Sequence, residues 1–421
     1  MKHVILGNGP AGVIAAETLR KQAPGCEIIL VGDEPEPPYS RMAIPYLLSG
    51  KIGEGGTYLR KDQNHFAAQK ITLVTGRAKA VDGNKRIVTL DGGSTLSFDR
   101  LLIATGSSPA SPPIDGIDLP GVHPCWTLAD ARRIMALAKP EAKVLQMGAG
   151  FIGCIIMEAL ASRGVALTVV EMGDRMVPRM MGAGAGAMIK RWVENKGVKV
   201  HTSSHVTAIE KKGGALSVSL SNGMKLDADL VISATGVKPN IGFLQQSGII
   251  CARGVVTDEH LQTNVPGVYA AGDCAEALDL PSGQHIVSAI QPNAADEAYC
   301  AAMNMAGKTM ALRGVTQINV LDTLGLISTS FGDWQGVPGG EHAELSDEDN
   351  YKFLRLEFGG DTLVGANSVG LTEHVGVLRG IIRSRVKLGA WKARLLEDPH
   401  ALMETYLATV QSQSAWGLKA S

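Results

Sequence analysis

Short runs of consecutive apolar residues alternate with glycine-rich and alanine-rich stretches near the start of the chain. Residues 4–6 are Val-Ile-Leu, residues 7–12 are Gly-Asn-Gly-Pro-Ala-Gly, an alanine-rich stretch continues to about residue 19, and residues 28–31 are Ile-Ile-Leu-Val. Continuous apolar runs of this length are typical of strands buried on both faces. The pattern therefore predicts strand, tight turn, helix and strand within about thirty residues, the size of a βαβ unit.

The same order of elements returns in the middle of the chain. Residues 144–147 form an apolar run, residues 148–153 are Gly-Ala-Gly-Phe-Ile-Gly, and residues 165–170 form another apolar run that ends at Glu171. One such glycine pattern is weak evidence for a nucleotide site, but two copies, each set between a strand and a helix, are strong evidence. The repetition indicates an internal duplication of one dinucleotide-binding design.

Each copy continues in the same way. Residues 71–98 and 201–226 contain short β-branched runs separated by turn residues, which predicts an antiparallel meander in each copy. Residues 101–106 and 230–236 are then apolar runs that end in Ala-Thr-Gly. Residues 108–120 are rich in proline and are expected to be a linker.

Composition narrows the function classes. The 421 residues carry a formal net charge of −1 and 5% aromatic residues, which argues against nucleic acid or an anionic membrane as partner. A membrane helix over 144–170 is the competing interpretation of that apolar stretch, but it would bury Glu158 and Arg163 in the bilayer. The six cysteines form no Cys-x-x-Cys pair, so no metal site is expected. Scattered cysteines of this kind indicate a protein of the reducing cytoplasm.

The first glycine turn has the chemistry of a pyrophosphate site. A helix N-terminus presents free N–H groups and a partial positive charge to an anion. Gly7 is expected to make the tight turn, Gly9 to allow close approach of the ligand, and Gly12 to let the helix pack on the strand. Asp33 or Glu34, near the end of the second strand, is expected to accept hydrogen bonds from an adenosine ribose.

The second turn repeats these roles with Gly148, Gly150 and Gly153. Glu171 then lies where the ribose 2′-hydroxyl of a bound dinucleotide is expected. A carboxylate there accepts from the hydroxyl and repels a 2′-phosphate, which favours NAD(H) over NADP(H), although Arg175 is close in sequence.

Five motifs resemble those of the two-dinucleotide flavoproteins of the pyridine nucleotide–disulfide oxidoreductase superfamily. They are the two glycine turns, Ala-Thr-Gly at 104–106 and 234–236, and Tyr-Ala-Ala-Gly-Asp at 269–273. The resemblance implies FAD at the first turn and NAD at the second. The residues that it assigns to FAD are Gly7, Gly9, Pro10, Ala11, Gly12, Asp33, Glu34, Arg41, Ala104, Thr105, Gly106, Gly272 and Asp273. Those that it assigns to NAD are Gly148, Gly150, Phe151, Ile152, Gly153, Glu171 and Gly236.

Pattern and resemblance together predict an α/β protein with two Rossmann-like dinucleotide-binding domains in a glutathione-reductase-like fold, plus a small α+β C-terminal interface domain. The FAD-binding domain is expected over residues 1–112 and 240–316, the NAD-binding domain over 113–239, and the interface domain over 317–421. Interface domains of this family often mediate dimers. A homodimer and a subunit of a hetero-oligomeric complex are both open.

Three positions depart from the family pattern. Relatives with a redox cysteine carry it in the loop that reaches the isoalloxazine ring, and its counterpart here is Met42, whose thioether cannot act as a thiolate. The lysine of ferredoxin-reductase-like relatives is replaced by Tyr46, while Arg41 matches a family arginine. A family glutamate near the nicotinamide is replaced by Ile155. Arg41, Met42 and Tyr46 are the flavin-proximal candidates, and the chemistry itself belongs to the flavin.

A flavoprotein without this thiol has to pass electrons to another molecule. The first hypothesis is an FAD-dependent NADH:acceptor oxidoreductase of the rubredoxin and ferredoxin reductase-like branch, with an iron–sulfur protein or subunit as partner. The alternatives are a thiol-independent NADH oxidase and an FAD- and NAD-binding sensor or interaction protein.

The loop over residues 35–52, with Gly-Thr-Tyr-Leu-Arg-Lys-Asp at 56–62, resembles more narrowly the flavin subunits of multi-subunit 2-oxoacid oxidoreductases, phenylglyoxylate dehydrogenase among them. This would make the chain an NAD+-reducing complex subunit. In the tail, residues 379–392 form a basic stretch with helical periodicity, either a solvated face or a surface that steers an acidic electron carrier. Trp334, Phe353 and Trp391 are candidates for an interface or for packing inside their own domain.

Overall fold

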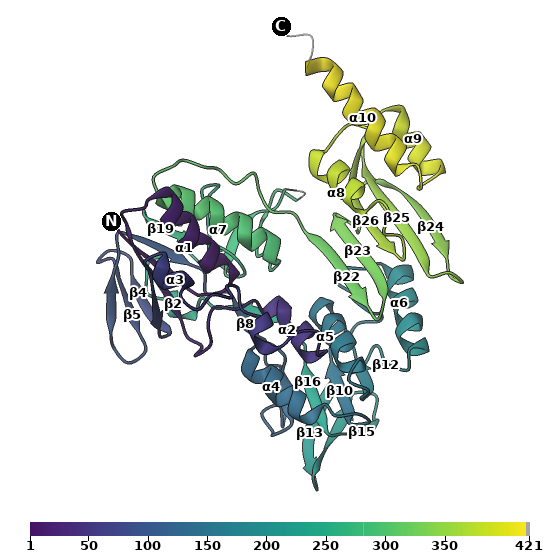
Figure 1. The fold of residues 1–421 in the computed structure, drawn as a ribbon. Coiled ribbons are helices and arrows are strands. Elements are labelled where there is room, and N and C mark those ends of the chain that lie inside the picture. Colours follow the sequence, from purple (N-terminus) through teal and green to yellow (C-terminus); the bar gives the residue numbers. More distant parts are fainter. Residues whose placement is uncertain (281, 418–421) are drawn as a thin grey trace. The chain divides into compact units, whose positions relative to one another are not determined.

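The computed structural model describes residues 1–280 and 282–417 (Figure 1). The chain divides into two compact units, one of residues 1–110 and 237–316 and the other of residues 111–236 and 317–421. The predicted three-domain assignment is finer than this division and stays a prediction.

The first unit is built on a five-stranded parallel sheet. Its order is β19 (Val268–Ala270), β7 (Arg100–Ile103), β1 (Lys2–Leu6), β2 (Glu27–Gly32) and β3 (Ile71–Thr75). The central strands β1 and β7 are buried on both faces, which explains their unbroken apolar runs. The sequence placed residues 71–75 in a meander; this was wrong, because β3 pairs in parallel with β2.

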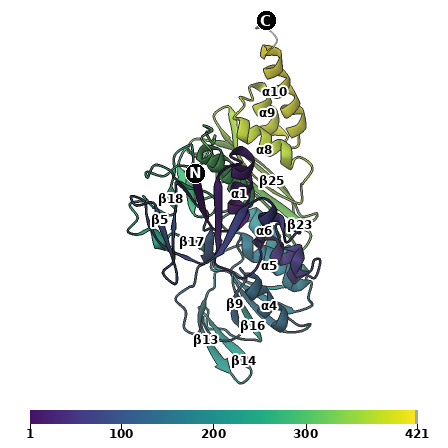
Figure 2. The same ribbon diagram turned by 60° about the vertical axis from the view of Figure 1, so that its left-hand side comes forward.

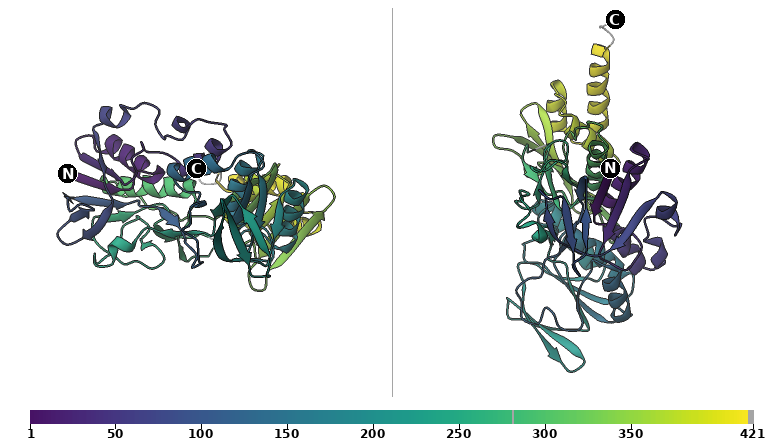
Figure 3. Two further views of the ribbon diagram at one scale, coloured as in Figure 1. Left: turned by 90° about the horizontal axis from the view of Figure 1, so that it is seen from below. Right: turned by 90° about the vertical axis from the view of Figure 1, so that its left-hand side faces the viewer.

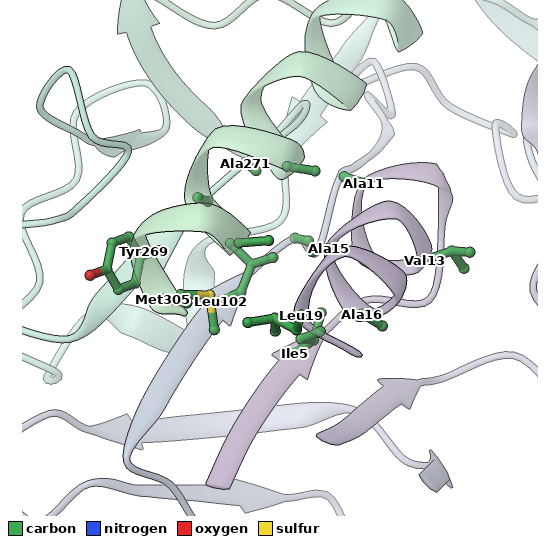
Figure 4. Close-up of a cluster of buried hydrophobic side chains, with 14 of the residues drawn as sticks. Ile5, Ala11, Val13, Ala15, Ala16, Leu19, Leu102, Tyr269, Ala271 and Met305 are labelled. Carbon is green, nitrogen blue, oxygen red and sulfur yellow. The ribbon is translucent and has the colours of Figure 1, made fainter. Parts of the chain in front are cut away.

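Two long helices cover one face of this sheet. They are α1 (Pro10–Gln22) and α7 (Gln291–Met305), and Figure 4 shows Ala11 and Ala15 on the side of α1 that faces α7. Ile5 and Leu102 contribute the strand side of the same buried cluster. Small alanine side chains let the two helix backbones approach closely, which fixes the start of α1 over the end of β1.

The other face of the sheet is covered by an antiparallel meander. It consists of β4 (Ala78–Asp82), β5 (Ile87–Leu90) and β6 (Thr95–Ser97). Its inward residues Val81 and Val88 pack in one cluster with Val4 and Leu101 of the sheet. The remaining elements of the unit are η1 (Arg41–Ala43), α2 (Ile44–Leu48), η2 (Glu54–Gly56), α3 (His65–Ala68), η3 (Gly242–Leu244), β18 (Val255–Val256), β20 (Ala275–Leu278) and β21 (His285–Ile286).

A two-stranded ribbon lies where the chain leaves and re-enters this unit. Strand β8 (Ser107–Pro109) pairs antiparallel with β17 (Val237–Pro239). Residues 108–120 were expected to be a linker, and the pairing of Ser108 with Lys238 corrects the first part of that prediction.

The second unit contains a sheet of the same design. Its order is β12 (Lys199–His201), β11 (Ala166–Val170), β10 (Lys143–Met147), β16 (Leu230–Ser233) and β9 (Val122–Pro124), and the strands are parallel. Its helices are α4 (Leu128–Leu137), α5 (Phe151–Ala161) and α6 (Ala183–Asn195). Figure 2 shows the meander of this copy, with β13 (Val206–Lys212) and β14 (Ala215–Leu220) as a long hairpin; β15 (Lys225–Ala228) completes it.

The C-terminal part of this unit is an antiparallel sheet covered by helices. The sheet order is β22 (Ile318–Thr323), β23 (Leu326–Gly332), β26 (Thr362–Val369), β25 (Lys352–Gly359) and β24 (Glu341–Asp347). The helices are α8 (Val375–Ser384), α9 (Ala390–Glu397) and α10 (Leu402–Gly417). Figure 3 shows α10, in yellow, extending beyond the strands of this domain.

Contacts within the unit join this sheet to the second glycine-turn domain. The Asn367 side chain donates to Met180 O over 2.9 Å and accepts from Gly182 N–H over 3.0 Å. Phe353 is buried, and its ring lies where a side chain on Gly184 of α6 would have to go. Phe353 is therefore a packing residue inside the unit, and the competing interface interpretation does not apply to it.

The basic stretch of residues 379–392 is interrupted. Helix α8 ends at Ser384, Arg385 adopts a left-handed conformation with φ 49°, and α9 begins at Ala390. The single helical stretch expected from the sequence was therefore wrong. Over the part of the chain that the structure describes, no helix combines the length and apolarity needed to cross a membrane, and the stretch 144–170 forms β10, α5 and β11.

Candidate functional site

The three glycines of the first turn differ in the space around them: two leave no room for a side chain, and one does. A Cβ on Gly7 (φ 108°) would lie 2.1 Å from Ala104 O, and one on Gly12 would lie 1.8 Å from Gly7 O. A Cβ on Gly9 would meet no atom within 4 Å. Contacts inside the protein thus explain Gly7 and Gly12, whereas the open space beside Gly9 leaves room for a ligand.

The open side of Gly9 coincides with the start of α1. Gly9 is the N-cap, Pro10 follows it, and no side chain caps the helix. The first N–H groups of the helix are therefore available to an anion, and the partial charge of the helix end is positive. The space beside Gly9, the free helix end and the absence of a Cβ together fit the pyrophosphate of FAD.

The acids after β2 are turned in different directions. Glu34 accepts hydrogen bonds from the Tyr39 hydroxyl over 2.6 Å and from Arg41 Nη2 over 2.8 Å. Asp33 forms an ion pair with Arg77, 2.7 Å apart. Arg41 is thereby fixed at the acid expected to hold the adenosine ribose, and the assignment of that ribose to Asp33 or Glu34 stays a prediction.

The predicted Gly272–Asp273 motif forms a buried turn after β19. Gly272 adopts φ 80°, and a Cβ on it would lie 3.4 Å from Ala11 Cβ, so this turn lies against the start of α1. Ser107 Oγ donates to Asp273 Oδ2 over 2.8 Å. Burial raises the pKa of Asp273, while the Ser107 hydrogen bond and the charge of Arg41 lower it. The structure thus brings together Ala11, Asp273 and Arg41, which are far apart in sequence.

The Ala104-Thr105-Gly106 segment is held by hydrogen bonds to Asn240, a residue that the sequence analysis did not single out. Thr105 Oγ1 donates to Asn240 O over 2.8 Å, and Asn240 Nδ2 donates to Thr105 O over 2.9 Å. The signal available in the sequence was the position of Asn240, which follows the second Ala-Thr-Gly motif by four residues. Ser107 and Glu297, both buried near Asp273, were also missed.

The flavin-proximal candidates lie in a loop whose backbone is well anchored. Ser40 N–H donates to Thr57 O over 3.0 Å, and the following helix α2 buries Leu47 and Leu48. On this anchored segment Met42 and Tyr46 are 48% and 52% exposed. The loop thus presents to solvent the two large side chains that were expected to replace a redox cysteine and a lysine.

The second glycine turn has the same steric logic as the first. A Cβ on Gly148 would lie 2.5 Å from Ala234 O, and one on Gly153 would lie 2.4 Å from Gly148 O. A Cβ on Gly150, the N-cap of α5, would meet no atom within 4 Å. The helix begins at Phe151, again without a side-chain cap, so this turn fits a second dinucleotide pyrophosphate.

Glu171 is tied to this turn through both carboxylate oxygens. Its Oε2 accepts from Ala149 N–H over 2.6 Å and its Oε1 accepts from Gly173 N–H over 2.7 Å. Arg175, which left doubt about the choice between NAD(H) and NADP(H), donates to Asp174 over 2.8 Å and to Met181 O over 2.9 Å. The guanidinium is thus engaged within its own loop, which supports the interpretation of Glu171 as a site for an unphosphorylated ribose.

The remaining predicted NAD residues surround the same helix. Phe151, Ile152, Ile155 and Glu158 form the partly exposed side of α5, and Gly236 adopts φ 108° after β16. Ile155, which was expected to replace a family glutamate, lies on this side, and Glu158 lies one turn further along it.

Thiol chemistry is suppressed throughout the chain. Burial raises the pKa of Cys125 and Cys154 to about 12 and that of Cys274 and Cys300 to about 11. Burial also raises the pKa of Cys26 and of Cys251, the exposed member of the six. All six thiols thus favour the protonated, unreactive form at neutral pH. Among the described residues, no group of three or more His, Cys, Asp or Glu side chains could hold a metal ion.

Comparisons with known proteins agree with this geometry. The model of the pyridine nucleotide-disulphide oxidoreductase family matches residues 1–298. The NADH-dependent phenylglyoxylate dehydrogenase subunit epsilon of Aromatoleum evansii is 31% identical over 405 residues, 95% of this chain and 96% of that protein. An NADH oxidase of Methanocaldococcus jannaschii is 32% identical over 316 residues, 73% of this chain and 70% of that protein. The solved covalent putidaredoxin reductase–putidaredoxin complex has a TM-score of 0.89 at 25% identity and covers 97% of this chain and 98% of that one. The predicted fold class is thereby confirmed.

Proposed function

The chain belongs to the pyridine nucleotide-disulphide oxidoreductase family, which binds FAD and NAD(H), and on this basis we propose that it passes electrons between NAD(H) and a separate iron–sulfur carrier or subunit. That it is an FAD-dependent NAD(H) oxidoreductase follows from the family; the identity of the other electron partner is the proposal. FAD, when bound, supplies the exchange between two-electron and one-electron chemistry.

The observation that carries the proposal is the state of the thiols. By resemblance to the family loop, Met42 replaces the redox cysteine, and all six cysteines have a raised pKa. A thiolate is the reactive form of cysteine, so no side chain of this protein is suited to receive electrons from the flavin and hold them as a disulfide. The electrons therefore have to go to another molecule.

The assignment of residues to the cofactors is part of the proposal. For FAD, the helix N-terminus at Gly9 would hold the pyrophosphate, Asp273 would accept from the ribityl chain, and Arg41 with Glu34 would fix the loop beside the cofactor. For NAD, the N-terminus of α5 would hold the pyrophosphate and Glu171 the ribose. The protein's contribution is to bind and orient the two cofactors and to exclude water.

Two similarities support the choice of partner. The phenylglyoxylate dehydrogenase subunit matches nearly the whole of both chains, which supports a role as the NAD+-reducing subunit of a 2-oxoacid dehydrogenase complex. The putidaredoxin reductase was solved in covalent complex with putidaredoxin, which supports a redoxin-type iron–sulfur carrier. Either assembly, or a homodimer, is compatible with a C-terminal interface domain over residues 317–421. The scattered free cysteines support a cytoplasmic location.

The test is anaerobic stopped-flow mixing of the FAD-loaded protein with NADH and then with a panel of acceptors. We expect rapid bleaching of the flavin by NADH and rapid reoxidation by ferredoxins or viologens, with much slower reoxidation by disulfides and oxygen. Failure with every one-electron acceptor would overturn the proposal.

A second candidate is a thiol-independent NADH oxidase, because the Methanocaldococcus jannaschii relative carries that name. It shares the glycine turns and needs no partner protein. Oxygen consumption as fast as the best rate with any carrier would favour it over the first proposal.

A further inference from the structure

A buried acid lies directly behind the Gly272–Asp273 turn. Glu297, in the middle of α7, is 1% exposed, and its Oε2 accepts a hydrogen bond from the Gly272 N–H over 2.6 Å. Gly272 holds a left-handed φ of 80°, and a Cβ on it would touch Ala11 and Ala294. The hydrogen bond to Glu297 therefore holds this turn in place against the first residues of α1.

Two acidic side chains raise the pKa of Glu297. Asp273 follows the supported peptide, and Asp296 precedes Glu297 on its own helix; both act on it electrostatically. Helix α1 packs on α7 through alanines and contributes the apolar side of the site, as Figure 4 shows for Ala11 and Ala15. A carboxylate in this setting would be buried beside Asp273, with the Gly272 N–H as its hydrogen-bond donor, and burial next to another acid favours the neutral form.

Burial acts on both acids of the site, but their other neighbours differ. Burial raises the pKa of Glu297 to about 8, the Gly272 N–H lowers it, and Asp273 and Asp296 raise it further. Burial also raises the pKa of Asp273, although the Ser107 hydrogen bond and the charge of Arg41 oppose this shift. Asp273 and Asp296 instead add to the effect of burial on Glu297, so Glu297 is the acid whose surroundings favour a retained proton.

We propose that Glu297 is a positioning residue for FAD: as the neutral acid it holds the Gly272–Asp273 turn against the start of α1, and its ionisation releases FAD. The reason is electrostatic. The pyrophosphate of FAD is anionic and is expected at the N-terminus of α1, which this turn touches, so a carboxylate behind the turn would add a second buried negative charge there. FAD binding is then linked to retention of one proton. This inference rests on the FAD site proposed above.

The linkage has a definite sign. If FAD prefers the form in which Glu297 is protonated, the dissociation constant of FAD stays constant below about pH 8 and rises by roughly tenfold per pH unit above it. Binding of FAD above pH 8 takes up a proton from the buffer.

The test measures FAD retention, independently of catalysis. The full-length holoprotein is dialysed to equilibrium between pH 6.5 and 9.5, free FAD is measured by its fluorescence, and circular dichroism checks the fold at each pH. In Glu297→Gln the side chain stays neutral and still accepts from Gly272, so its FAD affinity should not change with pH. Asp296→Asn, on the exposed side of the same helix, removes a charge that raises the pKa of Glu297, so its profile should keep the wild-type slope but begin to rise at a lower pH. Calorimetry in two buffers at pH 8.5 should show proton uptake by the wild type and none by Glu297→Gln.

Identical pH profiles for the wild type and Glu297→Gln, or a flat profile for the wild type, would overturn this inference. A wild type that binds no FAD at any pH overturns both the FAD site and the role of Glu297. A wild type that loses FAD above pH 8 as described, but reduces no carrier, supports the role of Glu297 while the proposed electron partner fails.

Discussion

The carboxylate of Glu171 accepts a hydrogen bond from the backbone N–H of Ala149 over 2.6 Å, which ties the end of β11 to the middle of the second glycine turn. The same carboxylate accepts from Gly173 N–H on its other side. An acid in this position both shapes the turn and presents negative charge to the expected ribose.

Replacing Glu171 by alanine should therefore weaken the binding of NADH and leave the binding of FAD unchanged. Two charge-assisted hydrogen bonds to backbone are lost, a change of about 2–3 kcal/mol in the local structure, so the apparent dissociation constant of NADH should rise at least roughly tenfold. The preference over NADPH should shrink because the carboxylate no longer repels a 2′-phosphate. Rapid-mixing titration of flavin reduction gives both constants. Glu210→Ala, which removes an exposed acid on β13, is the matched control and should change neither.

Gly9 and Gly12 should respond differently to the same substitution. Gly12→Ala forces a methyl group to 1.8 Å from Gly7 O, and a clash with backbone of this severity should cost about 3 kcal/mol or more in stability. Gly9→Ala meets open space at an extended backbone position, so the apoprotein should lose at most about 1 kcal/mol, the cost of alanine at an N-cap. Thermal melts of the apoproteins and FAD titrations separate the two effects. Normal FAD binding by folded Gly9→Ala would show that the open space holds no ligand.

The thiols should be dispensable for electron transfer. Cys251 is the exposed cysteine, so iodoacetamide at pH 7 should label it first, and slowly because its pKa is raised. Peptide mass spectrometry reports the labelled sites, and NADH-driven reduction of the flavin should be unchanged in the same sample. The variant Cys251→Ser should lose the label and keep the rate. Inactivation that follows labelling of any cysteine would contradict the thiol-independent mechanism.

His3 should make the fold sensitive to acid. Its ring is 1% exposed, neither ring nitrogen has a hydrogen-bond partner within residues 1–280 and 282–417, and burial, followed by the positive N-terminus and Arg100, lowers its pKa from 6.5 to about 4. Between these two values the unfolded chain binds a proton that the folded chain rejects. As the pH drops from 6.5 to about 4, the free energy of unfolding should therefore decrease by about 3 kcal/mol from this group alone.

The variant His3→Leu should lose this dependence. Its thermal midpoint should exceed that of the wild type by an amount that grows from pH 7 to pH 4.5. His205→Leu, which alters an exposed histidine, should follow the wild-type curve. Parallel curves for the wild type and His3→Leu would show that His3 is protonated without cost.

The basic side chains near the C-terminus offer a test of carrier docking. Arg379, Arg383 and Lys387 are exposed on α8 and the segment after it. If they steer an acidic carrier, changing all three to glutamine should slow carrier reduction roughly three- to tenfold in low salt and leave flavin reduction by NADH unchanged. The difference should vanish in high salt. Lys211→Gln, an exposed lysine on β13, is the control; an unchanged rate in the triple variant would reject a docking role.

The sequence was informative wherever local spacing determines the structure. The turns at Gly7 and Gly148 lie between a strand and a helix because tight turn, close approach and helix packing are all settled within six residues. The two Ala-Thr-Gly strands were found for the same reason. Glu171 was placed at the end of its strand by the length of one βαβ unit.

The sequence failed where the partner of a segment is distant. Ile71–Thr75 has the composition of a meander strand, and only its pairing with β2 makes it part of the parallel sheet. Glu297 looks like a solvated helix acid, because nothing near it in sequence shows that Gly272 lies against it. The helix break at Arg385 carries neither glycine nor proline, so its left-handed backbone gave no signal.

The requirement for glycine at the start of each turn comes from outside the turn. The carbonyl oxygen of Ala104 lies too close to Gly7 to admit a Cβ, and that of Ala234 does the same at Gly148. Each of these carbonyls directly follows a strand far downstream in the sequence. Neither turn is thus structurally independent of the rest of its sheet. If one glycine turn is moved into another protein, it should keep its conformation only when the neighbouring Ala-Thr-Gly segment is moved with it. The turn and this segment together are therefore the smallest unit that can be exchanged by recombination.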